Sequence, residues 1–184
     1  MKYWKTKTTS KIYPAIFNMK ILGIDPGSTR IGYGLINKDG NNLKFLQAGL
    51  LKISAKEKNL RLLDLEKSFS QLIKKEKPDL VAIEKLYFVK NLKTALEVGQ
   101  SRGVLILIII KNKLPVIEIT PSEAKLIVSG DGHASKKSIA KMVGYCLKIN
   151  TAGQIDDATD ALSLAIAAAN ILRNPTRIPL THNN

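Results

Sequence analysis

The sequence predicts one α/β domain built on a mixed sheet. Two observations carry this prediction: three short apolar runs follow one another closely between residues 20 and 53, and beyond residue 57 helical and strand-like segments alternate. Consecutive strands joined by tight turns pair antiparallel, whereas a strand–helix–strand alternation places its strands parallel. A length of 184 residues suits one domain. We therefore expect an antiparallel three-strand meander that continues into parallel strands, flanked by helices.

The meander comes first and a helix follows it. The three strands are expected within the segments 20–27, 31–41 and 43–53. The residues between them, Pro26-Gly27-Ser28 and Asp39-Gly40-Asn41-Asn42, are typical of tight turns. Leucine, isoleucine and phenylalanine then recur at helical spacing between Glu57 and Lys77, and Pro78 ends that helix.

The remaining elements alternate and then become helical. Buried strands are expected at Asp79–Glu84 and Pro115–Ile119, on either side of a long apolar helix from Lys93 to about Asn112. Three further helices are expected at about 121–128, 136–148 and 156–173. Thr120, Ser135 and Asp156 are typical N-cap residues for these helices.

The charge balance indicates an anionic partner. The chain has 29 Lys and Arg against 15 Asp and Glu, a formal net charge of +14, so nucleic acid or an anionic membrane surface is the expected partner class. The longest apolar run, Gly103–Ile110, is too short to span a bilayer. The single cysteine, Cys146, excludes an intramolecular disulfide and a cysteine-cluster zinc site, and it fits a reducing compartment.

The two ends of the chain differ from its body. Residues 1–18 contain four lysines and no acid, without a continuous apolar segment that would indicate a secretory signal. We expect this basic extension to be disordered or to lie upstream of the true start at Met19; an organellar transit peptide stays an alternative. Residues 19–174 are expected to form the folded domain and residues 175–184 a short tail. The predicted location is the cytoplasm.

Four acidic residues lie at positions where an ordinary solvent-exposed role does not account well for a carboxylate. Asp25 ends the first apolar strand, and Glu84 ends the strand 79–84. Asp157 and Asp160 share one face of the last helix, which is rich in alanine and can lie close to a sheet. If the first strand neighbours strand 79–84 and this helix crosses both, the four carboxylates converge. Taken singly, each acid also has an ordinary alternative as a turn residue, a rim charge or a helix cap.

Converging carboxylates need a counter-charge, because like charges a few ångströms apart raise one another's pKa. Oxygen ligands favour Mg²⁺ or Mn²⁺. Two such ions about 4 Å apart can activate a water and stabilise the leaving oxygen in phosphodiester hydrolysis. The positive charge elsewhere would hold a nucleic acid over the acidic site. The residues therefore predict a metal-dependent nuclease.

Four sequence motifs resemble those of the RuvC family, the bacterial Holliday junction resolvases. They are LGIDPGS with a following GYG, AIEKLYFVKN, GQSRGV, and Asp157-Ala158-Thr159-Asp160-Ala161-Leu162. The resemblance runs from about Met19 to about Arg173. It implies a ribonuclease H-like fold, a homodimer, and paired, near-symmetric nicks across a four-way DNA junction that leave 5′-phosphate and 3′-hydroxyl ends. It also implies two Mg²⁺ ions per site, replaceable by Mn²⁺, and cooperation with the RuvA and RuvB branch-migration proteins.

The resemblance also assigns site residues. The catalytic, metal-binding carboxylates fall on Asp25, Glu84, Asp157 and Asp160. The segment before the last helix is one residue longer than expected, which leaves Asp156 as a rival of Asp157. The DNA contacts fall on Tyr87, Lys85, Lys90, Lys125, Lys136 and Lys137. Tyr87 would stack on an unpaired base, with a place in the hydrophobic core as its alternative.

Two other functions stay open at this stage. The chain could be another ribonuclease H-like, structure-selective nuclease, or a junction-binding protein without catalysis. GIDPGS also resembles the first phosphate loop of actin and sugar-kinase folds, but those folds need a second nucleotide-binding lobe for which 184 residues are too few.

Overall fold

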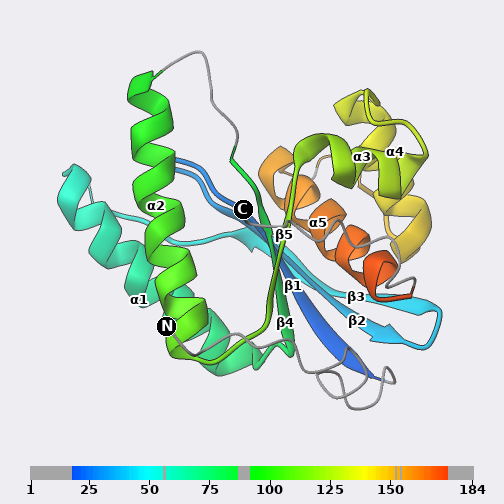
Figure 1. Ribbon diagram of the computed structural model, residues 1–184, viewed down its shortest axis with the longest axis horizontal. Helices are drawn as coiled ribbons and strands as arrows, with labels where there is room; N and C mark the ends of the chain where they lie inside the picture. The colour runs from blue at the N-terminus through cyan, green and yellow to red at the C-terminus, as the bar shows by residue number, and fades with distance from the viewer. Residues whose placement is uncertain (1–17, 56, 87–91, 152, 154, 174–184) are drawn as a thin grey trace, which may run out of the picture.

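The computed structural model describes residues 18–55, 57–86, 92–151, 153 and 155–173, which form one five-stranded sheet with helices on both faces (Figure 1). The strands are β1 (Met19–Asp25), β2 (Gly32–Asp39), β3 (Asn42–Leu50), β4 (Leu80–Glu84) and β5 (Val116–Ile119). The helices are α1 (Lys58–Glu76), α2 (Leu92–Lys111), α3 (Pro121–Ser129), α4 (Lys136–Leu147) and α5 (Asp156–Arg173).

The sheet confirms the predicted fold class. Its strand order is β3-β2-β1-β4-β5. β1, β2 and β3 pair antiparallel as the meander, whereas β4 pairs parallel with both β1 and β5. β1 and β4 are therefore neighbours whose carboxyl ends lie at the same edge of the sheet. Their pairing runs from Ile21–Leu80 to Ile24–Ile83.

Two hydrophobic layers cover the two faces of the sheet. Side chains alternate along a strand, so Leu22 and Ile24 of β1 pack with Phe69 of α1 and Leu105 of α2. Ile21 points to the opposite layer, which α3, α4 and α5 complete. Figure 1 shows α1 and α2 together on one side and α3, α4 and α5 on the other.

Helix α5 lies unusually close to β1 and β2. A Cβ placed on Gly23 of β1 would stand 1.9 Å from the carbonyl oxygen of Ala161, so only glycine allows this approach. Residues 164–169 of α5 are all buried, and four of them are alanine. The alanines of this helix thus bring its first turn to the carboxyl end of β1.

Most predicted element ends agree with the structure. Thr120 and Glu123 form a capping box at α3, and the Ser135 side chain caps α4. The third strand is shorter than the segment 43–53, because Leu50 pairs with Gly32, the first residue of β2, and no strand partner lies beyond it. The prediction that Asp156 is the N-cap of the last helix is wrong, because Asp156 is the first residue of α5.

The predictions for the two ends of the chain concern segments that, apart from Asn18, lie outside the described residues. Within the described part of the chain, no helix is both long and apolar enough to cross a lipid bilayer.

Candidate active site

Two acidic residues end two neighbouring parallel strands. Asp25 is the last residue of β1 and Glu84 the last residue of β4, one position beyond the Ile24–Ile83 pair. Both side chains are half-buried. The topology therefore places these carboxylates side by side at one edge of the sheet, as the strand order requires.

The first turn of α5 supplies two more acids. Asp157 and Asp160 are half-buried, whereas Asp156 is exposed. The backbone of Asp157 lies against the start of β2, where a Cβ on Gly32 would stand 2.0 Å from the Asp157 carbonyl oxygen. The absence of a side chain at Gly32 is thus a condition for the position of Asp157.

The four carboxylates influence one another electrostatically. Burial at the end of β1, together with the negative charges of Glu84, Asp160 and Asp157, raises the pKa of Asp25 to about 8, and burial is the largest cause. Burial also raises the pKa of Glu84. Charges from three other acids therefore act on Asp25, the carboxyl at the end of β1.

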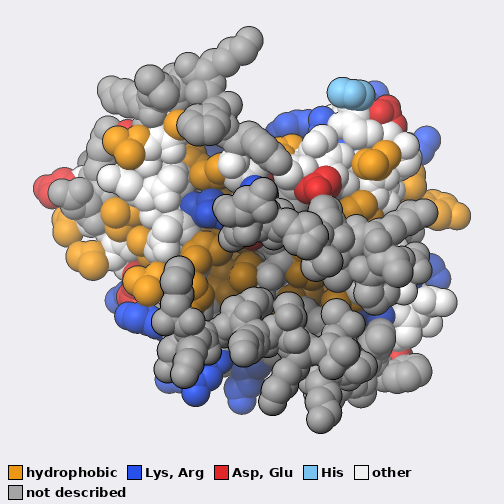
Figure 2. Space-filling view, viewed as in Figure 1, with side chains coloured by type: hydrophobic (Ala, Val, Ile, Leu, Met, Phe, Trp, Pro, Cys, Tyr) orange, Lys and Arg blue, Asp and Glu red, His pale blue; other side chains and the backbone are white. Residues whose placement is uncertain are grey.

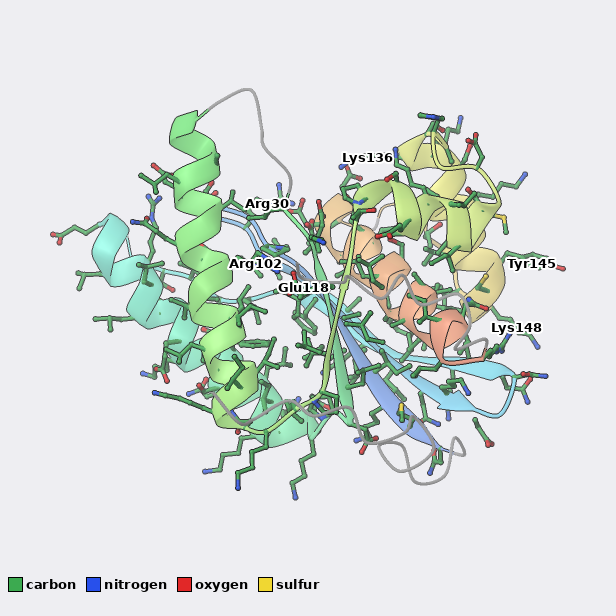
Figure 3. The ribbon with its side chains drawn as sticks, in the orientation of Figure 1. Arg30, Arg102, Glu118, Lys136, Tyr145 and Lys148 are labelled. Carbon is green, nitrogen blue, oxygen red and sulfur yellow. The ribbon has the colours of Figure 1, made fainter. Side chains whose placement is uncertain are left out.

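Two basic side chains contact the acids of α5. Arg30, between β1 and β2, has its Nε 2.9 Å from Oδ2 of Asp157. Lys136, the first residue of α4, donates from Nζ to Oδ2 of Asp160 at 3.1 Å. This hydrogen bond raises the pKa of Lys136. Figure 3 labels both residues near the start of α5.

The donor set fits a divalent cation. All four groups are carboxylates, which Mg²⁺ and Mn²⁺ prefer, and the raised pKa of Asp25 shows that an added positive charge would be stabilised there. No three acidic, histidine or cysteine side chains of the described residues already stand in a metal-binding arrangement. Asp157 and Asp160 each contact a basic side chain instead.

The family model described as crossover junction endodeoxyribonuclease RuvC matches residues 21–168. The chain belongs to the RuvC family. The crossover junction endodeoxyribonuclease RuvC of Petrotoga mobilis is 43% identical over 158 residues, a match that covers 85% of this chain and 96% of that protein. Membership confirms the predicted enzyme class, crossover junction endodeoxyribonuclease, and RuvC-family enzymes are generally metal-dependent.

Solved structures of RuvC share this fold. The structure of Thermus thermophilus RuvC superposes with a TM-score of 0.78 at 28% identity, covering 86% of this chain and 98% of that one. The same RuvC in complex with a Holliday junction substrate superposes with a TM-score of 0.79, at 28% identity, over 86% of this chain and 97% of that one. The ribonuclease H-like fold expected from the resemblance is confirmed.

The predicted DNA contacts are placed only in part. Tyr87 and Lys90 lie outside the described residues. Lys85 directly follows Glu84, and its backbone N–H donates to the carbonyl of Ile119 in β5. Lys125 is half-exposed on α3 and Lys137 is exposed on α4. Among the predicted lysines that the structure describes, Lys136 is the one in contact with a candidate catalytic carboxylate.

Sequence reasoning missed two arginines that contact the site. Arg30 follows the Asp25-Pro26-Gly27 turn, and the signal that could have identified it is a basic residue close in sequence to a candidate ligand. Arg102 lies in the long helix, directly before its apolar run, and its position alone does not indicate a contact with the site. Its Nε donates to the backbone carbonyl of Glu84 at 3.2 Å.

Proposed function

We propose that this RuvC-family chain cuts four-way DNA junctions at the carboxylate site. The observation that carries the proposal is that Asp25 and Glu84 end two neighbouring parallel strands in a chain of the RuvC family, and the charges of Asp157 and Asp160 act on Asp25. A cluster of carboxylates repels DNA unless it binds cations, so its presence in a protein of net charge +14 favours catalysis over binding alone.

The catalytic set is Asp25, Glu84, Asp157 and Asp160, which would together hold two Mg²⁺ ions or Mn²⁺ in their place. Such ions, when bound, activate the attacking water and neutralise charge on the leaving oxygen. Cleavage forms a bond from the water oxygen to phosphorus and breaks the bond to the 3′ oxygen, which gives 5′-phosphate and 3′-hydroxyl ends. The carboxylates would position the charge for this step.

The choice between Asp156 and Asp157 rests on the position of each side chain. Asp157 is half-buried and raises the pKa of Asp25. Asp156 is exposed, and its charge acts instead on Lys136. We therefore assign the third carboxylate to Asp157.

We assign the junction contacts to the residues that match the family's DNA contacts. They are Lys85, Lys90, Lys125, Lys136 and Lys137, together with Tyr87 as a base-stacking residue. Lys136 supports this assignment, because a side chain 68% exposed that already contacts Asp160 can exchange that partner for a phosphate.

A second copy of the chain is the partner we propose for the outer surface of α2. Leu96, Leu107 and Ile110 are 66, 52 and 63% exposed there. Gly99 and Gly103 lie at the spacing of the same helix face, and a Cβ on either would meet no neighbouring atom. Figure 2 shows hydrophobic side chains over α1 and α2 at one edge of the molecule. Small and apolar residues on one face allow two such helices to pack closely.

From family membership we further propose RuvA and RuvB as partners and the cytoplasm as the location. We also propose that residues 19–174 form the nuclease domain, between a basic N-terminal extension and a short C-terminal tail.

The test is a cleavage assay on a synthetic four-way junction, with and without Mg²⁺. Asp25→Asn and Asp157→Asn are each expected to lower cleavage at least about 100-fold, because each removes a charged ligand, whereas junction binding persists. Asp156→Asn is the matched control, one residue away on the same helix, and is expected to cut within about three-fold of the wild type.

Two results would contradict the proposal. One is loss of binding with retained cutting in Asp25→Asn. The other is a wild-type protein that cuts RNA–DNA hybrids in preference to four-way junctions, which would favour the alternative ribonuclease H-like activity.

A further inference from the structure

Glu84 occupies a position where its own strand is incompletely paired. The β1–β4 pairing ends at Ile24 and Ile83, so Glu84 lies one residue past the last pair with β1. On the other side, Glu84 pairs with Ile119, and the next backbone N–H, of Lys85, donates to the Ile119 carbonyl at 2.8 Å. Glu84 therefore has a paired residue in β5 and none in β1.

Arg102 provides a further contact at this point. It reaches from α2, and its Nε donates to the Glu84 carbonyl oxygen at 3.2 Å. A terminal nitrogen of the same guanidinium forms an ion pair and hydrogen bond with the carboxylate of Glu118 in β5. Figure 3 shows Arg102 and Glu118 side by side between α2 and β5. One side chain thus joins a helix to the ends of two strands.

The environment restricts the orientation of this arginine. The Arg102 side chain is only 21% exposed, and its neighbour Ser101 is buried. A largely buried guanidinium needs partners, and its planar set of donors can serve two acceptors at fixed angles. Glu118 lies one residue before Ile119, the residue that pairs with Glu84. Its carboxylate is thus placed to orient the guanidinium toward the Glu84 carbonyl.

We propose that Arg102, held by Glu118, is a positioning residue that fixes the backbone of Glu84 and thereby directs its carboxylate toward the metal site. The inference rests on the proposed function, because Arg102 would affect DNA cleavage only by positioning a catalytic Glu84. Partners one shell beyond a ligand commonly change metal affinity or activity about 10- to 100-fold when they are altered.

Arg102→Lys is the decisive variant. Lysine keeps the charge but presents a single ammonium nitrogen, which cannot hold both the Glu84 carbonyl and the Glu118 carboxylate in the geometry of a guanidinium. We expect kcat for junction cleavage to fall about ten-fold or more, with junction binding unchanged within about two-fold. In the DNA-free protein, Mn²⁺ binding measured by calorimetry is expected to weaken about three- to ten-fold, and excess Mn²⁺ should recover part of the lost rate.

Two further variants serve as a second test and as a control. Glu118→Gln keeps the side-chain shape and an acceptor oxygen, so we expect smaller losses of kcat and Mn²⁺ affinity than in Arg102→Lys. If Arg102→Lys does not fold, Glu118→Gln alone tests the inference. Lys111→Gln removes a charge from the last turn of the same helix and is expected to leave kcat and Mn²⁺ binding unchanged.

Wild-type kcat and Mn²⁺ affinity in both Arg102→Lys and Glu118→Gln would overturn the inference, as would a loss of rate explained entirely by a lower melting temperature. Failure of the proposed function looks different, since the wild-type protein itself would then leave four-way junctions uncut.

Discussion

Asp25 shows how a residue acquires its chemistry from neighbours that are distant in the sequence. As a residue before Pro26 and Gly27 it could be an ordinary turn acid. Its pKa of about 8 comes first from burial at the end of β1, and then from the charges of Glu84, Asp160 and Asp157. The pKa is raised by elements that only the folded chain brings together.

At the residue scale we predict a specific dependence of stability on pH in the metal-free protein. A carboxyl with a pKa near 8 in the folded state and near 4 when unfolded binds its proton more tightly in the folded state. Stability should therefore fall as the pH rises from about 4 to about 8, and level off above that range. Asp25→Asn has no such proton, so at pH 8 it should be more stable than the wild type by about 1–3 kcal/mol.

Urea unfolding in EDTA at pH 5 and pH 8 measures this difference. The variant keeps part of the pH dependence, because the pKa of Glu84 is raised as well. Added Mg²⁺ should stabilise the wild type at pH 8 more than the variant, since a cation favours the ionised carboxylates. Parallel pH profiles for the two proteins would show that Asp25 is not the group responsible.

At the element scale, the contact between α5 and β1 decides whether the site forms. The pattern of alanines predicts a helix that can lie close to the sheet. Gly23 and Gly32 provide the space on the sheet, because a Cβ on either would clash with the backbone of α5. Because α5 begins at the site and continues as the buried centre of one hydrophobic layer, its first turn cannot shift independently of the core.

Gly23→Ala tests this contact. The added Cβ would stand 1.9 Å from the Ala161 carbonyl, a backbone atom that can move only with the helix. We expect a loss of about 2–3 kcal/mol in the free energy of unfolding. Gly132→Ala is the control, because its Cβ would meet its nearest neighbour at 3.4 Å, and its stability should change by less than about 0.5 kcal/mol. Equal stability of the two variants in urea unfolding would argue against close packing of α5.

At the scale of the whole molecule, the chain presents two different surfaces. Lys136 contacts the carboxylate of Asp160, so a basic side chain borders the acidic site in a chain of net charge +14. The outer face of α2, with exposed Leu107 and Ile110, is apolar instead. One surface suits a polyanion and the other suits a second copy of the chain.

Leu107→Glu tests the second surface. A charge at the centre of an apolar helix contact should weaken dimerisation at least about ten-fold, because it would be buried without a partner. Sedimentation should then show a monomer at concentrations where we expect the wild type to be a dimer. Leu126→Glu changes an equally exposed leucine on α3, across the sheet, and should leave the dimer intact. A wild type that is monomeric under all conditions would refute this assignment of α2.

The sequence by itself determined the fold class, the family and the candidate acids. Strand and helix periodicity, turn residues and caps are local properties, so β1 to α5 could be predicted with small errors at their ends, such as Asp156. Tertiary structure alone decided which groups act on one another. The Arg30–Asp157 and Lys136–Asp160 pairs, and the link from Arg102 to Glu84, join residues 18 to 127 positions apart. Such contacts depend on how closely helices pack on the sheet, and packing distances are not encoded in the pattern of any single segment.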